Sequence, residues 1–195
     1  MNTVESHDTK PNILDKLSHF LTRHRLALII FLVVVAVAVV GLFVALEIST
    51  NRTERALVLV EALQTSYGEW LLLDQDLRAT EFDTLVSEIE DLVDSYPRTY
   101  AAQRAVYLHA GALTELERWN QASEHYVDLA DRFPDAYLAP ISLTQAAVAA
   151  ENNDDRELAL DILNRLVEQY AAESAEIPRA LFSIGRINEG LDNII

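Results

Sequence analysis

In the longer, C-terminal part of the chain, two histidines have the side chains best suited to metal binding or catalysis. His109 and His125 are the only histidines beyond residue 50. Helical spacing places His109 late in one predicted helix and His125 midway along the next, so their rings could face each other across a hairpin. A metal site would need a further ligand, such as Glu124 or Asp128. Packing in half-buried positions explains the pair more simply, so we expect no metal and no cofactor.

Carboxylates are abundant, but none stands in a recognisable catalytic pattern. Asp154 and Asp155 lie at a predicted helix start, where acidic side chains accept hydrogen bonds from free backbone N–H groups. The sequence has no glycine-rich phosphate loop, no G-x-S-x-G, no His-Glu-x-x-His and no calcium-binding loop. It also has no cysteine, which excludes a thiolate nucleophile and a disulfide. We therefore predict no catalytic residues and a protein that is not an enzyme.

An uninterrupted apolar stretch at residues 26–46 predicts a membrane anchor. A helix rises about 1.5 Å per residue, so this stretch would cross the roughly 30 Å hydrocarbon core of a bilayer. A cleaved signal peptide fits less well, because its apolar region is about 7 to 15 residues long and ends in a small-residue cleavage site. The sequence therefore predicts three parts: a tail at 1–25, a transmembrane helix at 26–46 and an outer domain at 47–195.

Charges on the two flanks predict the orientation of this helix. The basic residues Lys10, Lys16, Arg23 and Arg25 precede the apolar stretch, and Glu47 follows it. By the positive-inside rule, the N-terminal tail is cytoplasmic and the outer domain lies on the other side of the membrane.

The predicted outer domain is strongly acidic. Residues 47–195 hold eleven arginines, no lysine and twenty-eight Asp or Glu residues. Bulk charge of this sign repels phosphate backbones and anionic lipid headgroups, so we expect no nucleic-acid partner. The charge is most simply a solvated surface that keeps the domain soluble.

The outer domain has the apolar periodicity of an all-α fold. Its apolar residues recur at i, i+3, i+4 and i+7, strand-like alternation is absent, and Gly and Pro fall between the periodic segments. The predicted helices span residues 55–73, 81–96, 100–116, 120–133, 140–151, 155–170 and 178–190.

The helices also form an internal repeat with a period of about 37 residues. One shift of this length aligns Pro97 with Pro134 and Tyr100 with Tyr137. The same shift aligns Phe82 with Trp119, and Tyr96 with Phe133 and Tyr170. Nine further aligned residues are expected to face between helices: Leu85, Ile89, Leu92, Ala122, Tyr126, Leu129, Ala159, Leu163 and Leu166.

The repeat resembles the tetratricopeptide repeat (TPR) superfamily over roughly residues 60–190. The clearest copy, residues 103–136, has the small pair Ala110 and Gly111, a small Ala122, a packed Tyr126 and a terminal Pro134. The resemblance implies an α-solenoid of helical hairpins. The helix at 178–190 is either the first helix of an incomplete repeat or, more simply, a capping helix that covers the exposed apolar end of the array.

In tetratricopeptide arrays the first helix of each hairpin lines a concave groove that binds peptides. Transferring that property predicts a groove with three arginines and two aromatic rings, suited to a carboxylate or an acidic peptide. The alternative is that these arginines pair with neighbouring acids of the same surface. The predicted groove residues are Arg104, Tyr107, Thr114, Ile141, Thr144, Gln145, Val148, Arg179, Phe182 and Arg186.

The layout of tail, single span and outer helical repeats resembles the ancillary subunit family of the bacterial Sec translocon. That resemblance implies a single-pass inner-membrane protein with a periplasmic C-terminal domain. Its function would be that of a non-enzymatic scaffold beside the translocation channel that assists the handover of exported proteins. Its partners would be translocon components, exported proteins or envelope chaperones. The alternative function is a structural adaptor that binds one fixed partner in envelope assembly or cell division.

Overall fold

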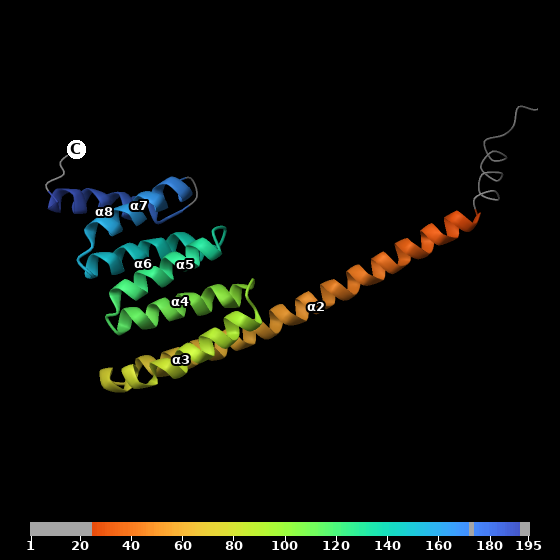
Figure 1. The fold of residues 1–195 in the computed structure, drawn as a ribbon, viewed down its shortest axis with the longest axis horizontal. Helices are drawn as coiled ribbons and strands as arrows, with labels where there is room; N and C mark the ends of the chain where they lie inside the picture. The colour runs from red at the N-terminus through yellow and green to blue at the C-terminus, as the bar shows by residue number, and fades with distance from the viewer. Residues whose placement is uncertain (1–24, 172–173, 192–195) are drawn as a thin grey trace, which may run out of the picture. The chain divides into compact units, whose positions relative to one another are not determined.

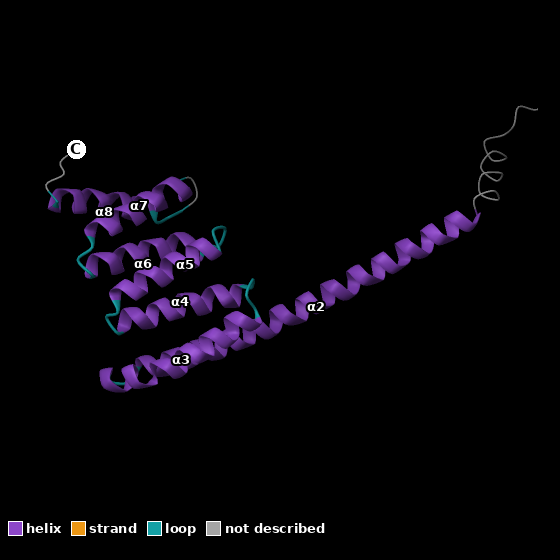
Figure 2. Cartoon of the chain, viewed as in Figure 1, coloured by secondary structure: helices purple, strands orange, loops and turns teal. Residues whose placement is uncertain are grey.

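The computed structural model describes residues 25–171 and 174–191, and all regular structure in these residues is α-helical (Figures 1 and 2). The all-α prediction is therefore confirmed for this part of the chain. The predicted tail lies outside the described residues up to His24, including Lys10, Lys16 and Arg23. The helices are α2 (Arg25–Leu71), α3 (Gln75–Ser95), α4 (Tyr100–Glu115), α5 (Trp119–Arg132), α6 (Leu138–Asn152), α7 (Arg156–Tyr170) and α8 (Ile177–Gly190).

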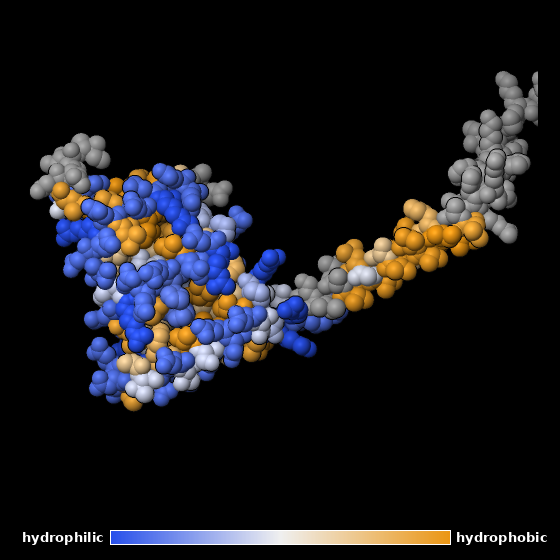
Figure 3. Space-filling view, in the orientation of Figure 1, coloured by the Kyte–Doolittle hydropathy of each residue, from blue (hydrophilic) through white to orange (hydrophobic). Residues whose placement is uncertain are grey.

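The chain divides into two units, residues 1–51 and 52–195. In the first unit, the side chains at positions 29–44 of α2 are apolar, apart from one glycine, and exposed (Figure 3). Within the residues that the structure describes, no helix meets the length and apolarity required of a membrane-crossing helix. The transmembrane helix at 26–46 stays a prediction. Because α2 runs to Leu71, the helix expected from about residue 55 has no separate start.

The second unit is a succession of helices, each packed on the next. From α3 to α8 every helix contacts its neighbour in the chain, and α4 also touches α6. Residues 52–71 of α2 run antiparallel to α3, because Arg52 donates to the Ser95 carbonyl at 3.1 Å and the Trp70 indole donates to the Arg78 carbonyl at 3.0 Å. This helical, repeat-like architecture agrees with the 37-residue periodicity.

The core lies where the aligned columns of the repeat predict it. All nine residues expected between helices are buried, and none is more than 5% exposed. Small residues let the helices approach closely. Ala122 is fully buried in α5, and next to it the Ser123 hydroxyl donates to the Ala146 carbonyl of α6 at 3.0 Å. This bond links two hairpins and satisfies a buried polar group.

Side-chain caps fix three of the helix starts. Asp155 accepts from the Leu158 N–H at 3.0 Å, which confirms its predicted capping role in α7. Thr99 caps α4 in the same way. Asp74 accepts from the Leu77 N–H at 3.1 Å, and this cap explains why α3 begins at Gln75 rather than near residue 81.

Candidate protein-binding surface

A cleft of about 790 Å³ opens where α5 and α7 end and where α6 and α8 begin. Its described walls come from α5, α6 and α7 and from the two segments that join α5 to α6 and α7 to α8. The described residues that line it are Ala130, Asp131, Pro134, Asp135, Ala136, Tyr137, Pro140, Ile141, Arg165, Gln169, Tyr170, Ser174, Ala175 and Glu176.

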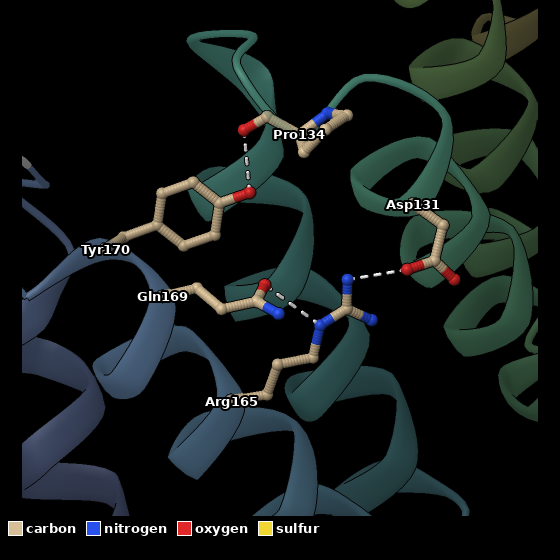
Figure 4. Close-up of polar contacts among 5 residues, drawn as sticks. All are labelled: Asp131, Pro134, Arg165, Gln169 and Tyr170. Atoms are coloured by element: carbon tan, nitrogen blue, oxygen red, sulfur yellow. Dashed lines mark hydrogen bonds and ion pairs between the residues drawn. The ribbon is translucent and has the colours of Figure 1, made fainter.

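Three hydrogen bonds hold one wall of the cleft in place (Figure 4). The Tyr170 hydroxyl donates to the Pro134 carbonyl at 2.8 Å, and the Arg165 guanidinium donates to Asp131 at 2.6 Å. The Arg165 Nε also donates to Gln169 at 3.1 Å. Burial raises the pKa of Tyr170, although nearby Arg165 lowers it, so the phenol stays protonated as a donor at neutral pH. The end of α7 is thereby attached to the end of α5.

The cleft offers aromatic surface and mostly negative charge. Tyr137 is 82% exposed, and Ile141 lies half-buried nearby. Arg165 is the one cation among the described lining residues, and Asp131 binds it. Asp135 and Glu176 add two more carboxylates. An open cleft with rings, prolines and backbone carbonyls suits an extended polypeptide better than a reacting small molecule.

Few of the predicted groove residues lie in this cleft. Ile141 lines it, whereas Val148 and Arg186 meet at a smaller cavity of about 440 Å³ between α6 and α8. The prediction that Thr144 lines an open groove is wrong. It is 2% exposed and its hydroxyl donates to the Pro140 carbonyl one turn earlier, so it belongs to the core.

The three predicted arginines differ in their surroundings. Arg186 donates to both carboxylate oxygens of Glu151 at 2.7 Å, which raises the pKa of Arg186. Arg104 donates to the Gln64 amide oxygen at 2.8 Å. Arg179 is exposed, and its guanidinium has no hydrogen bond or ion pair with any described residue. The alternative prediction, that these arginines pair with neighbouring acids of the same surface, is therefore correct for Arg186.

The remaining groove residues divide between an aromatic cluster and open surface. The ring of Tyr107 packs edge-on against Tyr126 at 5.4 Å between centroids, and burial raises the pKa of both phenols. The Thr114 hydroxyl donates to the Ala110 carbonyl at 2.9 Å. Gln145 is half-buried. Phe182 is 73% exposed on α8.

The two histidines face each other, as their helical spacing predicts. Their ring centroids lie 4.2 Å apart across the α4–α5 hairpin. Burial lowers the pKa of His109 to about 4, with a further contribution from the neighbouring His125. Among the described residues, no three His, Asp or Glu side chains converge as metal ligands. The two rings pack against each other inside the hairpin.

Comparison with known proteins adds no family. No family model matches the chain, and no curated protein matches it. The tetratricopeptide and Sec-translocon resemblances stay predictions.

The sequence contains a signal for the cleft in two of its aromatic residues. Tyr137 and Tyr170 both lie in aligned columns of the 37-residue repeat, and an aligned aromatic residue indicates packing. In the fold, Tyr137 is instead exposed and the Tyr170 hydroxyl binds a carbonyl in the preceding hairpin.

Proposed function

We propose that this protein is a membrane-anchored, non-enzymatic helical scaffold of tetratricopeptide type that binds protein partners. The observation that carries the proposal is the cleft formed by α5, α6, α7 and the segment before α8, with its fixed wall and its exposed Tyr137. An aromatic ring supplies apolar contact area at low entropic cost, and nearby carbonyls and carboxylates orient a bound chain.

The anchor in this proposal is supported by the sequence of residues 26–46 and by the basic residues before it. The exposed apolar side chains at positions 29–44 of α2 need a nonpolar environment, since burying such side chains is favourable. The outer domain then lies in the periplasm of a bacterium, and the first 25 residues lie in the cytoplasm.

The Sec translocon is the proposed place of action. Support comes from the resemblance in layout, and the partners would be translocon components, exported proteins or envelope chaperones. The alternative is an adaptor that uses the same cleft to bind one fixed partner in envelope assembly or cell division. The crosslinking experiment below distinguishes the two functions.

Photo-crosslinking from the cleft tests the partner. A crosslinking amino acid replaces Tyr137 in intact cells, with the same replacement at Tyr100, which is 50% exposed on α4, as the control. Translocon subunits together with many exported proteins, captured at Tyr137 and not at Tyr100, would support the Sec proposal. One fixed envelope protein would favour the adaptor. If the two positions capture the same proteins or none, the cleft is not the binding surface.

Cysteine labelling tests the anchor and its orientation. The chain has no cysteine, so Ser6→Cys and Ser87→Cys each create one unique thiol. In spheroplasts, a membrane-impermeant maleimide should label the thiol at position 87, on the exposed face of α3, and should reach position 6 only after lysis. Equal labelling of both positions before lysis, or release of the protein by alkaline extraction, would contradict the anchor.

A further inference from the structure

A groove of about 450 Å³ lies between the last turns of α2 and the facing part of α3. It shares no described lining residue with the cleft between the later helices. Its two walls are antiparallel helices joined by a short turn, so the groove runs along both of them. The described residues that line it are Ser66, Glu69, Trp70, Leu73, Leu77, Glu81, Thr84, Leu85 and Glu88.

The floor of the groove is apolar and fixed in position. Trp70 and Leu85 line it and are each 4% exposed. The Trp70 indole donates to the Arg78 carbonyl at 3.0 Å, and the ring stacks on Tyr67 with 5.9 Å between centroids. Leu77 also lines the groove and is 48% exposed, so it offers apolar area to an occupant. Because the floor is already ordered, binding there costs little additional conformational entropy.

The charged residues that line the groove are all acidic. Glu69, Glu81 and Glu88 are exposed, and their carboxylates have no hydrogen bond or ion pair with any described residue. Arg78 is the only basic residue in the sequence of α3. Its guanidinium lies 5.9 Å from the centre of the Trp70 ring and donates to Glu115 of α4 at 3.2 Å. The three glutamates are therefore not neutralised by a described cation.

Three other cavities of the same unit differ from this groove, because each contains an arginine that binds a carboxylate of the same lining. The pairs are Arg165 with Asp131, Arg186 with Glu151 and Arg132 with Asp128. Among its described lining residues, the groove between α2 and α3 has acids without such an arginine. An occupant that matches the groove therefore supplies the positive charge itself.

We propose that this groove, here called the α2–α3 groove, binds a basic amphipathic helix of another protein. Such a helix packs its apolar side chains on Trp70 and Leu77 and places its lysines or arginines beside the glutamates. Complementary charge of this kind gives specificity and speeds association. The groove and the cleft are different surfaces, so the inference does not depend on the proposed role of Tyr137.

The spacing of two glutamates predicts the spacing of basic residues in the partner. Glu81 and Glu88 are seven positions apart on α3, which is about two turns or roughly 10 Å along the helix axis. Both therefore lie on the same side of α3, and Leu85 lies between them. A partner helix that follows α3 matches them with two basic residues seven positions apart and with apolar residues in between. Glu69, on the α2 wall, presents a third acid to the occupant.

Two synthetic peptides provide the probe. Each is a labelled amphipathic helix of about 14 residues, or four turns, with leucines along one side. One peptide has two lysines two turns apart beside the leucines, and the other has glutamates at those positions. By fluorescence anisotropy, the lysine peptide should bind the full-length protein in non-ionic detergent at least about tenfold more tightly than the glutamate peptide at low salt. The difference should shrink at high salt, because salt screens exposed charges.

Charge reversal separates attraction by the groove from attraction by the acidic domain as a whole. Glu81→Lys combined with Glu88→Lys should reverse the preference between the two peptides. The matched control is Asp83→Lys combined with Glu90→Lys, which changes the net charge equally, at the same spacing, on exposed positions about 200° around α3. This control should still prefer the lysine peptide. Circular dichroism checks folding, and if the reversed variant is unfolded, the corresponding Gln variant should weaken lysine-peptide binding at least about threefold.

The apolar part of the groove has a test of its own. Leu77→Ala removes apolar area and should weaken binding of the lysine peptide by about fivefold. Leu72→Ala makes the same change at a leucine that is 87% exposed and is not among the lining residues, so it should leave binding unchanged.

Three results would overturn the inference. The first is the absence of lysine-peptide binding. The second is binding that the groove variants and their controls alter equally, which would assign it to the general acidity of the domain. The third is coverage of the groove by a second copy of this chain. Thr84→Cys gives a unique thiol in the groove, and quantitative disulfide dimers of the full-length protein under mild oxidation would establish that second copy as the occupant.

Discussion

The imidazole rings of His109 and His125 lie 4.2 Å apart, one from α4 and one from α5. At this distance the two rings cannot both become charged without repulsion, and the partial burial of His109 adds a desolvation cost. Both histidines line a small cavity between α3, α4 and α5, and Glu90 and Asp94 of α3 and Asp128 of α5 line it too. These carboxylates are exposed, and the pKa of His109 is nevertheless lowered to about 4.

This pair predicts a dependence of stability on pH. The pKa of His109 is about 4 in the folded protein and 6.5 in the unfolded chain, so between these values the unfolded chain binds a proton that the folded chain does not. Stability is therefore unaffected by this group above about pH 6.5 and falls as the pH drops toward 4. Thermal melts from pH 7 to 4.5 should show a steeper loss of Tm for the wild type than for His109→Gln.

The control for this prediction is Asn120→Gln, an exposed change at the start of α5 that should keep the wild-type slope. Parallel Tm profiles of wild type and His109→Gln would refute the assignment, because the many carboxylates of the domain would then account for the whole acid response.

Overpacking at Ala122 should destabilise the α4–α5 hairpin. Ala122 is fully buried, and α5 contacts both α4 and α6. Ala122→Leu adds three carbon atoms to this contact and is expected to lower the free energy of unfolding by about 1–3 kcal/mol, measured by urea denaturation. Gln121→Leu places the same side chain one residue earlier on an exposed position and should change stability little. Equal stabilities would show that the repeat register is wrong.

Sequence periodicity predicted the interior better than the surface. Columns such as Leu129 and Leu166 recur with the repeat, because each hairpin must bury the same stripe. The cleft depends instead on how the ends of different hairpins meet. The Tyr170 hydroxyl binds a carbonyl 36 residues earlier, and Arg186 binds Glu151 at a separation of 35. Neither partner is indicated by a local pattern, so the orientation of these polar side chains required the fold.

Two helical glycines should respond differently to alanine. A Cβ at Gly185 meets no atom within 4 Å among the described residues, so Gly185→Ala should gain about 0.5–1 kcal/mol from helix propensity. At Gly111, the Cβ would lie 2.9 Å from the Tyr67 hydroxyl, and the Tyr67 ring is stacked on Trp70. Displacing that ring offsets the gain, so Gly111→Ala should give no stabilisation in the same urea titrations. A similar gain at both sites would contradict the close contact.

The hydrogen bond from Tyr170 to Pro134 should affect the shape of the cleft more than the stability of the protein. Tyr170→Phe removes a 2.8 Å bond at a partly exposed site, so the expected loss is about 0.5–1.5 kcal/mol. Without the bond, the last turn of α7 keeps only the Arg165–Asp131 pair as its polar link to α5 in this wall, so the wall should loosen and crosslinking from Tyr137 to its partner should fall. Tyr137→Phe is the matched control, because it removes a hydroxyl from a ring that is 82% exposed in the same cleft and should not affect stability. If the two variants lose equal stability, the Pro134 bond does not fix this wall.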